Sequence, residues 1–209
     1  MDYTQTLNNY LENLSSKSPT PGGGNVAAFS GVLASSLAIM VCNLTMGKKK
    51  YVEVEAEIND TKNELEKFKT KFSELADKDN TAFDKVMDAF KLPKETDEEK
   101  DARTKKIDEA TFGAAEVPAE VINTCKDILP LIKTVAEKGN QNSLSDAGVA
   151  VSLINTAAEG AFLNVLINCT SLSNQTIGNE YLKRIEIIFE GVKNTCSEIS
   201  SLINNKLRS

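Results

Sequence analysis

Apolar residues recur every three or four positions between residues 52 and 90, which predicts one long amphipathic helix. The positions on its apolar face are Val54, Ile58, Thr61, Leu65, Phe68, Phe72, Leu75, Asp79, Phe83, Val86 and Phe90. A carboxylate, Asp79, therefore stands on this face between leucine and phenylalanine. Burying an ionised carboxylate is costly, so such a residue is usually a helix cap, an ion-pair partner or a functional group. Asp79 is the first candidate for chemistry, whereas Asp77 is predicted on the adjacent solvated face.

A second helix is predicted at residues 25–46, ending at Gly47, a residue suited to a left-handed cap. Residues 26–46 contain no charge and precede Lys48-Lys49-Lys50, a pattern that imitates a membrane span with its positive flank. However, the segment is dense in alanine, serine and other small or polar residues. We therefore predict a helix buried inside a bundle or a dimer, where small side chains permit close packing.

Further helical periods and breaks complete an all-α pattern without a convincing strand. Thr96 to Glu99 reads as a capping box that opens a helix, and Val117-Pro118 marks a kink or a new first turn. The remaining predicted helices span residues 3–14, 145–168 and 174–206, with a Pro/Gly-rich break at 18–25 and a polar loop at 139–146. The sequence thus predicts one domain over residues 1–209, a bundle of long antiparallel helices.

Composition restricts the chemistry that this domain can perform. The chain has no histidine, so general acid–base work falls to carboxylates, lysines or water, and the commonest transition-metal ligand is missing. Its four cysteines form no C-x-x-C pair, which predicts reduced thiols in a cytoplasmic protein, without a metal site. A net charge of −6 argues against a general nucleic-acid binder. The hydrophilic remainder of the chain offers no second membrane span.

Several short motifs, in a fixed order over nearly the whole chain, resemble the cyclodeaminase/cyclohydrolase family. This family includes the C-terminal half of formiminotransferase-cyclodeaminase and stand-alone bacterial methenyltetrahydrofolate cyclohydrolases. The motifs are Pro21-Gly22-Gly23-Gly24-Asn25, Leu44-Thr45, Gly47-Lys48-Lys49-Lys50-Tyr51, Leu75-Ala76-Asp77-Lys78-Asp79, Ala82-Phe83, Leu92-Pro93-Lys94, Glu98-Glu99-Lys100-Asp101, Gly139-Asn140, Ser145-Asp146 and Asn164-Val165-Leu166-Ile167-Asn168. The resemblance implies an all-helical homodimer that acts on one-carbon tetrahydrofolates without a metal or redox cofactor. It also implies that Asp79 is catalytic.

The resemblance suggests substrate contacts at both ends of the buried helix. The N–H groups of Gly22, Gly23, Gly24 and Asn25 can face an anion or a pterin edge, although a tight turn explains the glycines equally well. Lys48 and Lys49, with Lys50, can bind the glutamate tail of a folate that is polyglutamylated, although a solvated charge run is an equal alternative.

Three polar residues near the C-terminal half are weaker candidates for substrate contact. Asn164 and Asn168 share one helix face, where substrate or dimer contact competes with helix–helix hydrogen bonding. Asp146 is most simply a first-turn carboxylate favoured by the helix dipole, and the family motif adds the possibility that it lines the site.

The leading hypothesis is a folate enzyme that hydrolyses 5,10-methenyltetrahydrofolate to 10-formyltetrahydrofolate. The alternative is a formimidoyltetrahydrofolate cyclodeaminase, which releases ammonia as the methenyl ring closes. The absence of a fused transferase favours the first. In both, Asp79 would move the proton at the reacting carbon, if a dry site draws its pKa toward neutrality. A non-enzymatic helical assembly module is a further alternative.

Overall fold

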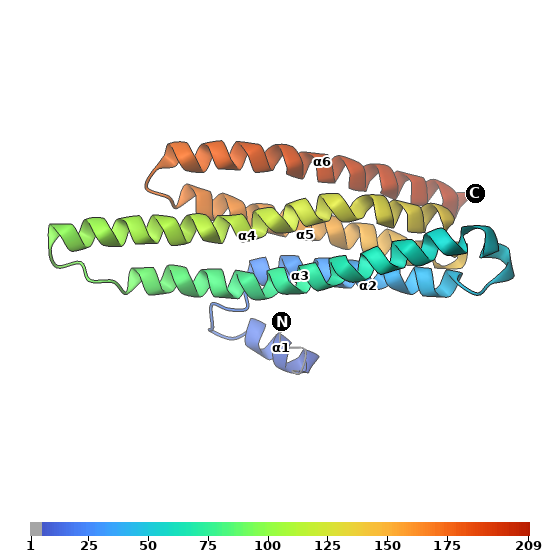
Figure 1. The fold of residues 1–209 in the computed structure, drawn as a ribbon, viewed down its shortest axis with the longest axis horizontal. Helices are drawn as coiled ribbons and strands as arrows, with labels where there is room; N and C mark the ends of the chain where they lie inside the picture. The colour runs from blue at the N-terminus through green and yellow to red at the C-terminus, as the bar shows by residue number, and fades with distance from the viewer. Residues whose placement is uncertain (1–5) are drawn as a thin grey trace.

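The computed structural model describes residues 6–209, and within that range it contains six α-helices and no β-strand. The helices are α1 (Leu7–Leu14), α2 (Gly23–Thr45), α3 (Glu55–Phe90), α4 (Asp97–Lys138), α5 (Leu144–Thr170) and α6 (Gln175–Arg208). Short 3-10 helices, η1 (Lys49–Val54) and η2 (Gln141–Ser143), complete the chain. Helices α2 to α6 run side by side as an antiparallel bundle, and α1 projects from it (Figure 1). The all-α prediction is confirmed, whereas the predicted start of α1 at Tyr3 lies outside the described residues.

Helix α2 lies in the core, because its small residues let neighbouring helices approach. A Cβ atom on Gly31 would collide with the Phe72 ring of α3, and one on Gly160 of α5 would lie 3.1 Å from Ala27 Cβ. By length and composition alone, α2 and the segment Gln141–Thr170 are apolar enough to cross a membrane, so the prediction of no second such segment is wrong by this criterion. Of the α2 window, 67% is buried in the bundle, against 39% for the second segment. The prediction of a buried core helix is therefore confirmed. Gly47 follows α2 with a φ of 73°, the left-handed conformation predicted for it.

The apolar face of α3 is buried over its first half and opens over its second half. Ile58, Leu65 and Phe72 are fully buried, whereas Phe90 is 49% exposed. The reason is visible in Figure 1: the C-terminal end of α3 and the N-terminal end of α4 extend beyond the other helices. Residues 52–54, predicted as α-helix, belong instead to η1. Asp79 stands where the packed half gives way to the open half.

Helix α4 starts at the predicted capping box, in which Thr96 Oγ1 accepts from the Glu99 N–H at 3.2 Å and the Glu99 carboxylate accepts from the Thr96 N–H at 3.1 Å. The alternative of a new first turn at Pro118 is wrong, because α4 continues through Pro118. Pro118 has no N–H for the carbonyl of Ala114, and Asn168 of α5 donates its Nδ2 to that oxygen at 3.0 Å. A side chain from another helix thus replaces the missing backbone bond.

The predicted polar loop at 139–146 is shorter in the structure, because η2 and the first turn of α5 occupy most of it. Gly139 and Asn140 connect α4 to η2, and α5 begins at Leu144 rather than Ser145. The last helix, predicted at 174–206, is α6, and its Lys206 ammonium donates to the terminal carbonyls of α4, at 3.2 Å to Ala136 and 3.0 Å to Glu137. These contacts close the bundle at the end opposite to Asp79.

Candidate active site

Asp79 lies against the first turn of α2, at the glycines that begin that helix. Gly22 is the N-cap residue, and Gly23 and Gly24 form the first turn. A Cβ atom on Gly24 would collide with the Asp79 carboxylate, so only glycine leaves room for the carboxylate at this position. The glycine run and the aspartate on α3, which are more than fifty residues apart in the sequence, therefore form one structural unit.

The Asp79 carboxylate is half-buried, and burial raises its pKa above the ordinary aspartate value. The backbone N–H of Asn25, at the positive end of α2, hydrogen-bonds to the carboxylate and opposes that rise without cancelling it. Within residues 6–209, no lysine or arginine forms an ion pair with Asp79. The ion-pair interpretation of this carboxylate therefore has no support. The alternative of a hydrogen bond to a neighbouring helix is realised at Asn25, and the carboxylate is in addition partly desolvated.

Asn25 contributes its backbone to the site, while its side chain is used for packing. This side chain is 2% exposed; its Nδ2 donates to the Ala76 carbonyl at 2.8 Å, and its Oδ1 accepts from the Tyr10 hydroxyl at 2.9 Å. Asn25 thereby connects the start of α2 to α3 and α1. Because its backbone N–H bonds to Asp79 and its side chain is used within the protein, Asn25 has no free donor for the predicted substrate contact.

A cavity of about 360 Å³ opens beside Asp79, and four helices contribute to it. Its walls include Phe83 and Val86, which follow Asp79 on the same face of α3, together with Ala114 of α4. The sequence placed Phe83 and Val86 on the apolar face of the helix but did not predict them as site residues. Their positions one and two turns after Asp79, on the same face, are the signal that could have identified them as cavity walls. The volume lies in the range of small-molecule sites.

Both predicted asparagines of α5 reach this cavity, and both also make hydrogen bonds within the protein. Asn164 Nδ2 donates to the Gly160 carbonyl of its own helix at 2.8 Å, and Asn168 Nδ2 bonds to Ala114 as described. The helix–helix alternative is therefore realised at Asn168. Asn164 lies beside the glycine turn, since a Cβ on Gly23 would be 3.7 Å from its Nδ2.

Three predicted site residues lie at the other end of the bundle. Lys48 and Lys49 follow the end of α2, whose 23 residues span about 35 Å, and both are exposed. Asp146 lies in the first turn of α5, as the helix-dipole interpretation predicted, about 27 Å along the axis from Asn164. The structure of one chain does not bring these residues to Asp79. Within residues 6–209, there is no group of three His, Cys, Asp or Glu side chains that could hold a metal ion.

The fold and the site together define an all-helical bundle with a desolvated carboxylate facing a cavity. Residues 6–187 match the model of the formiminotransferase-cyclodeaminase family, and the chain belongs to that family. The predicted family membership is confirmed.

Named relatives cover both activities predicted from the sequence. The chain is 45% identical to a methenyltetrahydrofolate cyclohydrolase of Methylorubrum extorquens, over 87% of this chain and 88% of that protein. It is 30% identical to the formimidoyltransferase-cyclodeaminase of Rattus norvegicus over 90% of this chain, but spans only 35% of that longer protein. The crystal structure of a formiminotetrahydrofolate cyclodeaminase from Thermotoga maritima superposes with a TM-score of 0.78 at 33% identity, covering 96% of this chain and 98% of that one.

Proposed function

We propose that this protein hydrolyses 5,10-methenyltetrahydrofolate to 10-formyltetrahydrofolate, with Asp79 as the group that moves the proton. The observation that carries the proposal is the Asp79 carboxylate, half-buried in a cavity, with a pKa raised by burial. A relative of nearly the same length, named for this reaction, supports the choice of substrate. A non-enzymatic assembly module has no such support, because the relatives are named as enzymes.

The proposed reaction needs a base and then an acid at one carbon. Water adds to the methenyl carbon between N5 and N10 while Asp79 accepts one of its protons. The bond from this carbon to N5 then breaks and N5 takes up the proton from protonated Asp79. The oxygen releases its remaining proton to solvent and becomes the formyl carbonyl on N10, so one proton is released overall. A carboxylate with a raised pKa suits both steps, because it is a stronger base when ionised and is more readily protonated near neutral pH.

The other cavity residues would position the folate. The Phe83 ring offers an apolar surface beside Asp79 for the flat pterin or the p-aminobenzoyl ring. The first turn of α2, from Gly22 to Gly24, presents backbone N–H groups without side chains, so a planar ligand can approach the main chain closely. Asn164 would supply a polar contact at the opposite wall. In this proposal, no metal or redox cofactor takes part.

The second candidate is the cyclodeaminase reaction, in which N10 rather than water attacks a formimino carbon on N5 and ammonia leaves. The rat relative and the Thermotoga maritima structure favour it. Both reactions need the same proton transfer, so the site is compatible with either. Incubating the purified protein with each substrate and following the methenyl absorbance distinguishes them: the cyclohydrolase consumes the methenyl form, and the cyclodeaminase produces it with ammonia. No change with either substrate would contradict the whole proposal.

We also infer that the active form is a cytoplasmic homodimer with no membrane segment. Helices α2 and α5 pack against each other, yet both expose apolar side chains, including Leu33 on α2 and Leu163 on α5. A two-fold axis across these helices would bury them and would place the Lys48 end of one copy against the Asp79 end of the other. This arrangement would let Lys48, Lys49 and Asp146 contribute to the partner's site. Leu33→Glu should yield monomers by light scattering, whereas a wild-type monomer would exclude the dimer.

A further inference from the structure

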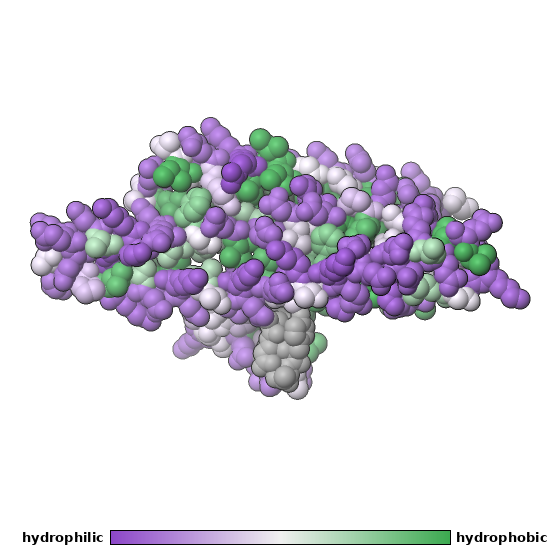
Figure 2. All heavy atoms as spheres, in the orientation of Figure 1, coloured by the Kyte–Doolittle hydropathy of each residue, from purple (hydrophilic) through white to green (hydrophobic). Residues whose placement is uncertain are grey.

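Helix α1 is anchored to the bundle by Tyr10. Among the described residues of α1, Tyr10 alone is buried, at 6% exposed, whereas Leu7 and Leu11 are 63% and 50% exposed. The helix projects from the bundle both in the ribbon and in the space-filling view (Figure 1 and Figure 2). The way in which α1 meets the rest of the protein therefore depends on one side chain.

The Tyr10 side chain makes an aromatic contact and a hydrogen bond with α2. Its ring centroid lies 5.3 Å from that of Phe29, and its hydroxyl donates to Asn25 Oδ1 at 2.9 Å. Burial raises the pKa of the Tyr10 hydroxyl, so the hydroxyl stays protonated and remains a donor near neutral pH. Because Asn25 is 2% exposed, water does not compete for this bond.

Asn25 in turn contacts α3 at two points on the same helical turn. Its Nδ2 donates to the Ala76 carbonyl at 2.8 Å, and its backbone N–H hydrogen-bonds to the Asp79 carboxylate. Ala76 and Asp79 are three residues apart, within one turn of α3. Since the amide and the N–H belong to one residue, a side chain that is fixed at both ends of its amide also fixes the N–H that faces the carboxylate.

Tyr10 and Asn25 lie behind the carboxylate and outside the cavity. The described residues that line the cavity include Gly22 to Gly24 and Asp79, but neither Tyr10 nor Asn25. Both side chains are therefore out of reach of a ligand in the cavity. Any effect that they have on a reaction there must pass through Asp79.

We propose that Tyr10 and the Asn25 side chain are positioning residues for Asp79, which hold the Asn25 N–H against the carboxylate and fix its direction toward the cavity. This inference rests on the proposed function, in which Asp79 moves the proton. A carboxylate held by a fixed donor presents its free lone pairs in a constant direction, whereas a loosely held one adopts several orientations, most of them unproductive. Helix α1 thus contributes to the reaction from outside the cavity.

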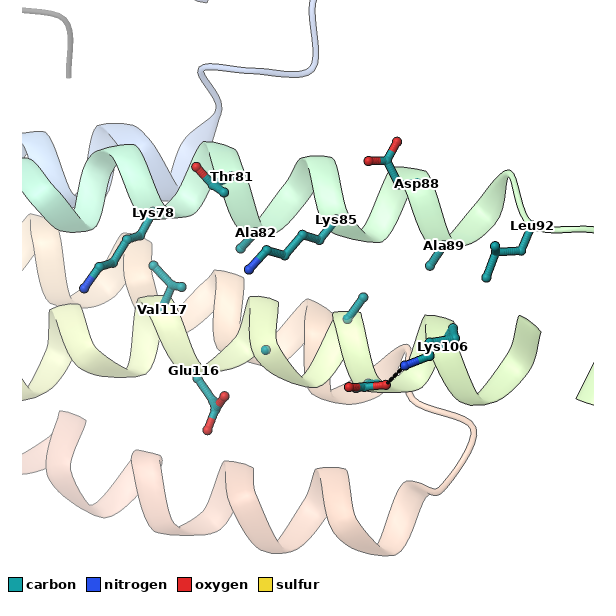
Figure 3. Close-up of a pocket in the computed structure, with 13 residues that line it drawn as sticks. Lys78, Thr81, Ala82, Lys85, Asp88, Ala89, Leu92, Lys106, Glu116 and Val117 are labelled. Carbon is teal, nitrogen blue, oxygen red and sulfur yellow. Dashed lines mark hydrogen bonds and ion pairs between the residues drawn. The ribbon is translucent and has the colours of Figure 1, made fainter. Parts of the chain in front are cut away.

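Few charges disturb the contact between Asn25 and Asp79. Lys78 and Lys85, the lysines on either side of Asp79 along α3, line a neighbouring groove of about 730 Å³ between α3 and α4 (Figure 3). Asp77 lines a different hollow, between α2 and α3. Of the described residues that line the Asp79 cavity from α2, α4 and α5, none has a charged side chain. A change in the pKa of Asp79 therefore reports on its burial and on the Asn25 donor.

The test measures kcat, KM and their pH dependence in Tyr10→Phe and Asn25→Ala. Tyr10→Phe removes the hydroxyl and keeps the ring against Phe29, so kcat should fall by about threefold to tenfold while KM stays the same. Asn25→Ala removes both side-chain bonds and should lower kcat by roughly tenfold to a hundredfold. In both variants the acid limb of kcat/KM should move to higher pH, because a weaker N–H bond opposes the raised pKa of Asp79 less.

Tyr181→Phe on α6 is the matched control. It also removes the hydroxyl of a tyrosine that packs on a phenylalanine, Phe112, with ring centroids 5.0 Å apart, and it should keep the wild-type profile. Reduced thermal stability of Tyr10→Phe with wild-type kcat and an unmoved acid limb would show a merely structural contact and overturn the proposal. A raised KM at constant kcat would overturn it as well. Tyr10→Phe is the milder change, and it decides the test if Asn25→Ala does not fold.

A titration without substrate separates this proposal from the proposed function. The pKa of the Asp79 carboxyl can be measured by carbon-13 NMR, with Asp79→Asn identifying its signal. A higher Asp79 pKa in Tyr10→Phe and in Asn25→Ala than in wild type supports the positioning role even if neither folate is turned over, in which case only the reaction assignment fails. An unchanged or lower pKa in either folded variant would overturn the positioning role, whatever the activity.

Discussion

Polar side chains are buried or half-buried at both ends of helix α2. Only at the N-terminal end is one of them a carboxylate, Asp79, that faces a cavity. At the C-terminal end, Asn140 is 5% exposed and its polar atoms have partners: its N–H donates to Thr45 Oγ1 at 2.8 Å and its Nδ2 to the Leu44 carbonyl at 3.1 Å. Its Oδ1 accepts from the Asn142 N–H at 3.2 Å. At the N-terminal end, Asp79 faces a cavity and its pKa is raised.

The comparison separates polar residues that build the fold from a polar residue that is available for chemistry. A buried amide with every hydrogen bond made contributes to specificity and stability and has no capacity left for a ligand. A desolvated carboxylate beside open volume is destabilising for the protein, and is retained where the chemistry needs it. The family motifs include residues from both ends, so the motifs alone do not distinguish these roles.

The largest expected effect is the loss of turnover in Asp79→Asn. The amide keeps the size of the side chain but cannot accept a proton from water, so kcat should fall by about a hundredfold to ten-thousandfold. Circular dichroism should show an unchanged helix content. If the purified variant kept near-wild-type kcat with either folate, Asp79 would not be the proton-transfer group. The polar residues at the two ends of α2 would then not differ in chemical role.

A smaller loss of activity is expected from Gly24→Ala, which acts on Asp79 without changing it. The added methyl group must displace the carboxylate, and a displacement of about 1 Å can lower the rate by up to roughly a hundredfold. Overpacking should also cost about 1–3 kcal/mol of stability. Gly191→Ala on α6 is the control, because its Cβ would meet nothing within 4 Å and it should keep full activity. Equal activity of the two variants would show that Asp79 tolerates displacement.

At the other end, Asn140→Ala should affect stability rather than catalysis. It removes the acceptor for Asn142 and the donor to Leu44, and the loss of these two partly buried hydrogen bonds should together cost about 1–3 kcal/mol. For a chain of this size, the melting temperature should fall by roughly 3–10 °C. Thermal unfolding measures the loss, and kcat at a temperature where the variant is folded provides the comparison. A tenfold fall in kcat without destabilisation would contradict a purely structural role.

The sequence predicted the elements well because each depends on a local pattern. The period of α3 identified both the helix and the unusual position of Asp79, and the Thr96 capping box gave the start of α4. The contact of Asp79 with Gly24 could not be predicted, because it joins separate elements and depends on how α2 docks on α3. The sequence could not decide between a kink and a new first turn at Pro118 for the same reason, since the compensating donor comes from α5.

Helix length could have narrowed one prediction, the placing of Lys48 and the glycine turn in one site. A buried helix of more than twenty residues places its two ends about 30 Å or more apart, so the glycine turn and Lys48 could not lie in one site of a single chain. The resemblance grouped them because it orders motifs along the sequence and does not locate them in space.

The raised pKa of Asp79 predicts opposite effects of pH on activity and stability. Water attack needs the ionised form, so kcat/KM should fall on the acid side with an apparent pKa above the ordinary aspartate value of about 3.9. Folded Asp79 binds its proton more tightly than unfolded Asp79, so its stabilising contribution, present below the unfolded pKa, is lost as pH rises through the folded value. Asp79→Asn should therefore be more stable than wild type at neutral pH, by about 0.5–2 kcal/mol. Chemical denaturation at neutral and acid pH measures this gain, which should shrink as pH falls; a gain independent of pH would contradict the shift.

The smallest effect concerns Asn168, whose role at the cavity can be separated from its role in the fold. Its bond to the Ala114 carbonyl is needed because Pro118 lacks an N–H, so Asn168→Ala alone should cost about 1 kcal/mol. Pro118→Ala restores a backbone donor to the same carbonyl, and Asn168→Ala should then cost less in that background. The difference between the two costs, measured by denaturant unfolding of all four proteins, is the coupling energy.

The two costs would be equal only if Asn168 and Pro118 acted independently, and that result would contradict the compensation. Asn164→Ala is the matched control in both backgrounds, because its bond stays within α5 and does not involve Ala114. If the predicted coupling is found, the Asn168 amide belongs with Asn140 among the groups that build the bundle. Ala114, which lines the cavity beside Asp79, would then owe the hydrogen bond of its carbonyl to the Asn168 amide of α5, because Pro118 of α4 has no N–H.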